Sequence, residues 1–223
     1  MKRSSTDELI SALARGIRPV RRVAPLGWQA TGVCAVAAAL LLALVMLSGL
    51  RRDELGAGSG SAPFLLTSLG LALVSLGGVT AALASSRPGR ERLEWRSITI
   101  SIAALAICGS AAALVLLGTP LAGDPGWGGV GEIPCVLSSL TSAIIPALIL
   151  IRLAASGAPL RPERTALWAG WGATGLAAFA ANLTCRTPGA WHEVLTHALI
   201  PVLGSLLLMT ALGALLRRWT RAT

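Results

Sequence analysis

The sequence predicts an all-α polytopic membrane protein, a bundle of six transmembrane helices. Hydrophobic residues make up 54% of its 223 residues, and the mean hydropathy is +0.71. The apolar residues form six stretches near the length of about 20 residues with which a helix crosses a bilayer. The stretches do not alternate with period two, and in lipid only helices and closed barrels satisfy the backbone. The predicted spans are 28–50, 62–85, 97–118, 134–151, 165–183 and 196–216.

The basic residues between the spans predict their orientation. The seven polar segments hold, in order, six, two, four, none, three, one and three Lys and Arg residues, so sixteen lie in the alternate segments that include both termini. Basic residues in short loops are retained in the cytoplasm. Both termini are therefore expected inside, with loops 51–61, 119–133 and 184–195 outside. The net charge of +9 fits contact with anionic lipid of the bilayer, and no direct contact with nucleic acid is expected.

Tryptophan supports these boundaries, because its ring favours the membrane–water interface. None is expected in the middle of a span. All seven are placed in loops or at the ends of the stretches: Trp28, Trp95, Trp127, Trp168, Trp171, Trp191 and Trp219.

Residues 1–27 form the longest polar segment, followed by the predicted transmembrane domain 28–216 and a tail, 217–223. Apolar residues at helical spacing predict an amphipathic helix of about three turns that ends near Gly16. A helix this short is marginal in water, so we expect the membrane surface, the bundle or a protein partner to order it. Its apolar positions are Leu9, Ile10, Leu13, Ala14 and Ile17.

The four cysteines differ in predicted depth. Cys34 and Cys108 fall within spans, where a thiol is usually a small buried apolar side chain. Cys135 opens the fourth span and Cys185 follows the fifth, so both are expected at the outer face, which is oxidising in a bacterial envelope. This pair is a redox-active or metal-reactive sensor, a permanent disulfide, or two unrelated thiols.

The two histidines, His192 and His197, follow Cys185 with the spacing Cys-x6-His-x4-His. With Cys135, and Glu132 or Glu193 nearby, they could bind a metal ion in a tetrahedral zinc-type site. The spacing matches neither a helical i, i+4 pair nor a known zinc finger. Interfacial histidines that bond to the backbone or water are therefore the favoured interpretation, and no other cofactor is expected.

The sequence contains no recognisable catalytic constellation, so we do not expect an enzyme. No G-x-S-x-G context surrounds Ser138 and Ser139, and no phosphate-binding loop is present. No Asp, Glu, Lys or Arg lies inside a predicted span, although pumps and carriers usually need ionisable groups there. Two alternatives remain. A small transporter or permease-like subunit needs a polar path, and a membrane thiol oxidoreductase normally has a C-x-x-C pair or a quinone site.

Several short motifs resemble the NrsF-type anti-sigma factors. The opening TDELISALARGIRPVRRV, residues 6–23, is similar to the start of that family. Cys135, Ile145-Pro146 and the turn with Arg152 and 157–159 look like the family's fourth span and following loop. The segment 182–185, Asn-Leu-Thr-Cys, resembles its cysteine after the fifth span.

This resemblance implies a six-span regulator of the bacterial inner (cytoplasmic) membrane. Its cytoplasmic N-terminus would hold an extracytoplasmic-function sigma factor away from RNA polymerase. Cys135 and Cys185 would sense oxidants or heavy metals, although Arg186 stands where many members have proline. The candidate sigma-binding residues are Asp7, Glu8, Leu9, Ile10, Leu13 and Ile17, followed by a juxtamembrane stop at Pro19, Arg21 and Arg22.

Overall fold

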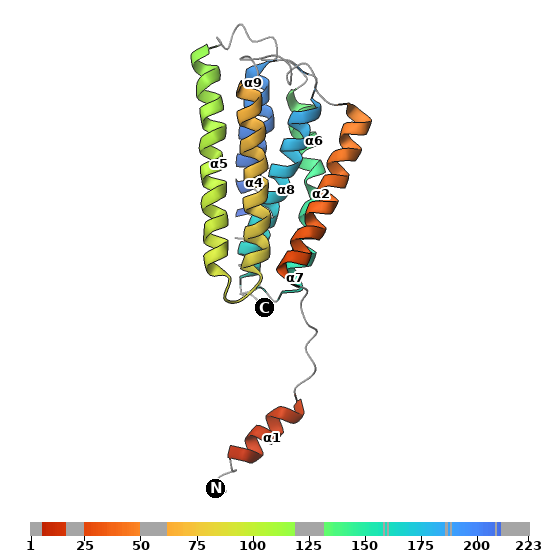
Figure 1. Cartoon of the computed structure of the whole chain (residues 1–223), viewed down its shortest axis with the longest axis vertical. Helices are drawn as coiled ribbons and strands as arrows, with labels where there is room; N and C mark the ends of the chain where they lie inside the picture. Colours follow the sequence, from red (N-terminus) through yellow and green to blue (C-terminus); the bar gives the residue numbers. More distant parts are fainter. Residues whose placement is uncertain are drawn as a thin grey trace.

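The described part of the chain contains helices and no strands, which confirms the predicted all-α class (Figure 1). The computed structural model describes residues 6–16, 25–49, 62–118, 132–157, 159, 161–185, 187, 189–207 and 209–210. The helices are α1 (Thr6–Gly16), α2 (Leu26–Ser48), α4 (Ala62–Ser85), α5 (Glu91–Gly118), α6 (Glu132–Ser142), α7 (Ile144–Ala155), α8 (Pro162–Thr184), α9 (Ala190–His192) and the π-helical segment η3 (Glu193–Leu199). After η3 the chain continues as an α-helix to residue 207.

Four helical segments of the described chain are long and apolar enough to cross a membrane: Leu26–Leu47, Ala62–Ser85, Glu91–Gly118 and Ile133–Ala155. The sequence predicts six spans, and four of them are confirmed by length and composition. Helix α8 has 23 residues, but its glycine, threonine, tryptophan and asparagine residues make it less apolar. The last helix is described as apolar only over Glu193–Leu207, and its expected end at 216 lies outside the described residues.

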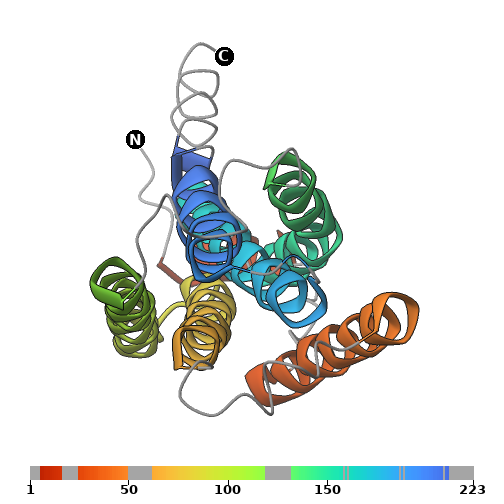
Figure 2. The same ribbon diagram turned by 90° about the horizontal axis from the view of Figure 1, so that it is seen from above.

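Helix α8 is less apolar because protein surrounds it. It packs against α2, α4, α6, α7 and η3, and it lies in the middle of the bundle when seen from above (Figure 2). Small residues let its backbone approach its neighbours. A Cβ atom added to Gly78 of α4 would lie 2.5 Å from the Cα of Gly172 in α8. A helix in this position needs small side chains more than lipid-facing apolar ones.

The helix boundaries follow from local chemistry. Helix α4 coincides with the predicted span 62–85. Helix α5 begins at Glu91, six residues before the predicted start, because Glu91 and Glu94 suit the positive end of the helix dipole. The fourth predicted span is divided into α6 and α7, with Ala143 between them. Pro146 explains the break, since proline has no N–H to donate to the carbonyl of Ser142.

Two predictions about individual side chains are wrong. Trp171 lies well inside α8 and is only 6% exposed, packed beside Leu71 and Val74 of α4. Because α8 is internal, this ring fills the core and not an interface. Cys34 is exposed on α2, whereas Cys108 is buried as predicted. Helix α2 lies at the edge of the bundle (Figure 2), so only part of its surface meets other helices.

Candidate functional site

Two cysteines and two histidines meet at one end of the bundle. Cys135 lies in the first turn of α6, Cys185 directly follows α8, His192 ends α9 and His197 lies in η3. The two sulfur atoms and one ring nitrogen of each histidine all lie within 4.8 Å of one another. The labels α6 and α9 in Figure 1 mark this end, opposite the end at which α2 begins. Four elements, α6, α8, α9 and η3, therefore contribute to one small cluster, which we call the Cys/His cluster.

The π-helical geometry of η3 brings the two histidines together. In an α-helix, residues five positions apart differ in direction by about 140°. In a π-helix the backbone bonds join residues i and i+5, so such residues lie one above the other. The rings of His192 and His197 are 5.1 Å apart between centroids and meet edge to face. The five-residue spacing of His192 and His197 does not suit a pair of metal ligands on an α-helix, but it does suit one in this π-helical segment.

The contacts within the Cys/His cluster are short and partly enclosed. The Sγ atoms of Cys135 and Cys185 are 3.7 Å apart, and both thiols are free and half-buried. The Sγ of Cys185 is 3.4 Å from Nε2 of His192. Both imidazoles are 1% exposed. The Thr196 hydroxyl donates to the His192 carbonyl and holds the turn between the two histidines.

The surroundings of Cys185 favour its thiolate. Burial raises the pKa of this thiol, but the hydrogen bond with His192, the adjacent His197 and the backbone N–H of Thr187 outweigh burial and lower the pKa to about 4. The thiolate is the form of cysteine that reacts with oxidants and binds metals. Cys185 is thus the more reactive partner of the pair.

The structure places the histidines differently from the favoured sequence interpretation. They are buried, and His192 contacts a cysteine. Nδ1 of His192 and both ring nitrogens of His197 have no hydrogen-bond partner among the described residues. The described cluster includes no carboxylate. Glu193 is buried elsewhere in η3, and the side chain of Glu132 lies outside the description.

The candidate sigma-binding residues up to Leu13 fall on α1, whose helical structure and end at Gly16 were predicted. This helix lies away from the bundle (Figure 1). Ile10 is 56% exposed, and Glu8 is exposed as well. The other predicted positions lie outside the described side chains or residues: Asp7, Leu9, Leu13, Ile17, Pro19, Arg21 and Arg22.

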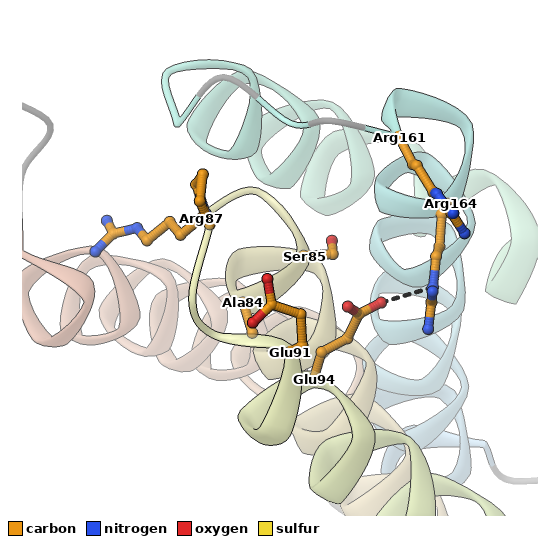
Figure 3. Close-up of a pocket in the computed structure, with 8 residues that line it drawn as sticks. Ala84, Ser85, Arg87, Glu91, Glu94, Arg161 and Arg164 are labelled. Atoms are coloured by element: carbon orange, nitrogen blue, oxygen red, sulfur yellow. Dashed lines mark ion pairs between the residues drawn. The ribbon is translucent and has the colours of Figure 1, made fainter.

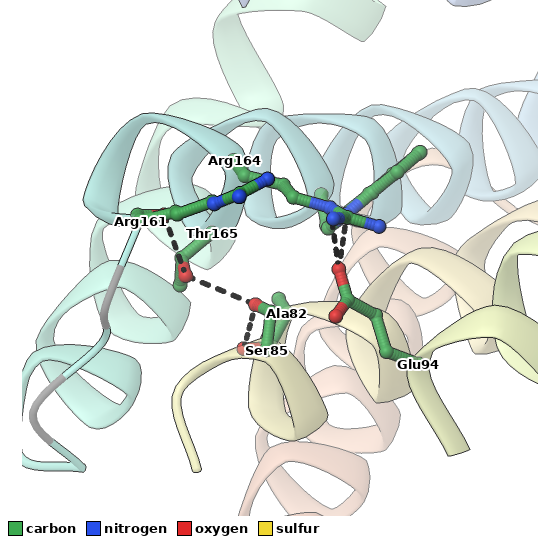
Figure 4. A network of polar contacts seen from close by, with 7 residues as sticks. Ala82, Ser85, Glu94, Arg161, Arg164 and Thr165 are labelled. Atoms are coloured by element: carbon green, nitrogen blue, oxygen red, sulfur yellow. Dashed lines mark hydrogen bonds and ion pairs between the residues drawn. The ribbon is translucent and has the colours of Figure 1, made fainter. Parts of the chain in front are cut away.

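The opposite end of the bundle holds a charged cavity of about 290 Å³ (Figure 3). Its charged lining consists of Arg87, Arg161, Arg164, Glu91 and Glu94. The Nε of Arg164 is 2.7 Å from a carboxylate oxygen of Glu94, which is buried (Figure 4). The sequence indicates this site by the acids that stand among the arginines of segments 86–96 and 152–164. The arginines alone were used, to predict the orientation of the helices, so the site was missed.

Comparison with known proteins identifies the family. No curated protein and no solved structure matches the chain significantly. The family model NrsF, described as negative regulator of sigma F, matches residues 13–219. The match begins at residue 13, within α1, and includes the whole Cys/His cluster. Membership of the family is thus confirmed over nearly the full length, while residues 6–12 of the opening motif lie before the match. The chain belongs to the NrsF family of negative regulators of sigma F.

Proposed function

We propose that this chain is an integral-membrane anti-sigma factor of the bacterial inner membrane. It holds an extracytoplasmic-function sigma factor through α1 and releases it when a thiol oxidant or heavy metal reacts at Cys135 and Cys185. Family membership supports the sigma-factor partner, since a negative regulator of a sigma factor must act on one. The observation that carries the sensing step is the meeting of both cysteines at the end of the bundle opposite the start of α2.

The proposed topology has six spans with both termini in the cytoplasm. Helix α8 and the last helix would complete the four apolar spans, because each runs alongside them through the bundle (Figure 1). Arg87, Arg152, Arg161 and Arg164 lie at helix ends on the side where α2 begins. By the positive-inside rule this side is cytoplasmic. The Cys/His cluster then faces the envelope, and α1 faces the cytoplasm.

Helix α1 is suited to binding a groove on another protein. Its Ile10 is exposed, and apolar anchors recur along its sequence at helical spacing. An amphipathic helix of this kind lays its apolar face into a groove of its partner. Asp7 and Glu8 add charge that favours a basic surface, such as the DNA-binding side of a sigma factor, and raises specificity and association rate.

A series of contacts connects the two ends of the bundle. Cys135 stands at the start of α6, and the α6–α7 pair ends beside Ser156. Ser156 accepts a hydrogen bond of 3.4 Å from Gln29, near the start of α2. Gln29 in turn accepts a bond of 2.7 Å from Arg87. A shift of α6 and α7 at the cluster would thus reach the helix that follows the sigma-binding segment. Such coupling requires two states of the bundle.

Serine substitution of the cysteines tests the sensing step. We expect Cys135→Ser and Cys185→Ser each to abolish the transcriptional response to cadmium or an oxidant, because a hydroxyl neither forms a disulfide nor binds soft metals well. The exposed Cys34 offers a matched control, and Cys34→Ser should respond normally. Target-gene reporters in cells measure the effect. A normal response from both cluster variants would remove the sensor from the proposal and leave sigma binding in place.

A further inference from the structure

We propose that Cys135, Cys185, His192 and His197 form a tetrahedral Cys2His2 site for one thiophilic d10 metal ion of the Zn²⁺ or Cd²⁺ type. This inference rests on the same cysteine pair as the proposed function and adds the two histidines as ligands. The ion would join the start of α6, the end of α8 and the start of the last helix. All four donors come from the described part of the chain.

The distances within the Cys/His cluster agree with such a site. Zinc lies about 2.3 Å from a thiolate sulfur and about 2.0–2.1 Å from an imidazole nitrogen. In a regular tetrahedron these bonds place two sulfurs about 3.8 Å apart and a sulfur and a nitrogen about 3.6 Å apart. The structure has 3.7 Å between the sulfurs and 3.4 Å between Cys185 and His192. The remaining donor pairs lie within 4.8 Å, so their separations need to shorten by at most about 1.5 Å to bind the ion.

The unpartnered imidazoles give an independent observation. His197 is 1% exposed, and neither of its nitrogens has a hydrogen-bond partner among the described residues. A buried polar group without a hydrogen-bond partner destabilises the fold, because it has lost its contacts with water and gained none in exchange. One of these nitrogens lies within 4.8 Å of both sulfurs and of a ring nitrogen of His192. Coordination of a metal ion gives His197 the partner that the described residues do not provide.

The π-helical segment is the third observation. Such segments are rare and occur frequently at functional sites. The change from α-helical bonding at His192 to π-helical bonding in η3 brings His192 and His197 to the same side. A disulfide between Cys135 and Cys185 would need no histidine and no π-helix, and its sulfurs would have to approach to about 2.05 Å. The metal site accounts for all four side chains and for the helix type.

Binding of Co²⁺ to the purified, reduced full-length protein in detergent tests this site, because tetrahedral Co²⁺ has intense visible bands and Zn²⁺ displaces it. We expect one Co²⁺ per chain, with sulfur-to-metal charge transfer, and complete loss of the bands on adding Zn²⁺. His197→Gln should weaken binding more than about 100-fold, since even changes in the shell around a ligand cost 10–100-fold. Cys34→Ser, outside the cluster, should bind normally. Helix content by circular dichroism confirms that each variant is folded.

Two results would overturn the site. One is reduced wild-type protein that binds no Co²⁺. The other is binding that persists unchanged in both His197→Gln and Cys135→Ser. Neither result touches sigma binding, which is measured separately by co-purification. Conversely, a protein that binds Co²⁺ through these four residues but retains no sigma factor would keep the metal site and overturn the proposed function.

Discussion

Replacing Leu13 with aspartate is expected to release the sigma factor and raise transcription of its target genes to the level of cells without the protein. Leu13 and Leu9 lie one turn apart on α1, among the apolar positions that the sequence predicts to enter a groove of the partner. A charged residue there loses apolar burial and places a carboxylate in an apolar contact. Central interface residues of this kind are worth about 3 kcal/mol, or roughly 100-fold in Kd. Leu9→Asp should act in the same way.

The matched control for these variants is Ser11→Asp. Ser11 is exposed and lies two positions from both leucines, on the opposite side of a helix. Ser11→Asp introduces the same charged residue into the same helix, away from the apolar positions. Binding of the purified sigma factor to each full-length variant in detergent, together with a target-gene reporter, measures the effect. Equal release by Ser11→Asp, or retention by both leucine variants, would contradict the assignment of the binding face.

The second large effect is expected at the charged cavity, where Arg164→Met should lower the free energy of unfolding by about 3 kcal/mol or more. Glu94 is buried, and its carboxylate accepts from Arg164 at 2.7 Å and from Trp168 at 3.2 Å. Without Arg164 the carboxylate remains buried and loses its charged partner. Arg164 also lies over the Trp95 ring, 5.1 Å from its centroid, so its removal costs a cation–π contact as well.

A double-mutant cycle separates this charge effect from general damage. Glu94→Gln removes the charge and keeps a hydrogen-bond acceptor, so it should cost less, about 1–2 kcal/mol. The double variant should be more stable than Arg164→Met alone, because no buried charge remains. Arg92 is an exposed arginine of α5, the helix that holds Glu94. Arg92→Met should therefore change the free energy of unfolding little. Tryptophan fluorescence during denaturant unfolding in micelles gives these values. A double variant no more stable than Arg164→Met would exclude the buried-charge explanation.

Much of the fold could be predicted from the sequence because apolar length and charge alternation report directly on membrane helices. The span 62–85 was predicted to the residue. The central position of α8 in the bundle could not be predicted from apolar length and charge. Its glycine, alanine and tryptophan residues suit packing against other helices. A hydropathy scale measures only the preference for lipid, so it gives no sign of this internal position. For the same reason Trp171 was placed at an interface when it belongs to the core.

The candidate site was predictable in part. Cysteine depth followed from the span boundaries and placed Cys135 and Cys185 on the same face. Their separation could not follow, since it depends on how α6 and α8 pack. The histidine spacing argued against a shared ligand site only on the assumption of an α-helix. The π-helical turn at η3 changes that geometry. No residue type in the segment predicts a π-helix.

The most direct test of the account is recovery of the sigma factor with the full-length protein before and after an external challenge. Intact cells are treated with a thiol oxidant that does not cross the cytoplasmic membrane, and the protein is then captured from solubilised membranes. We expect the sigma factor to accompany the untreated wild-type protein, to be lost after treatment, and to be retained by treated Cys185→Ser. Absence of any sigma factor from the untreated sample, or equal recovery before and after treatment of the wild type, would contradict a membrane anti-sigma factor that senses from outside.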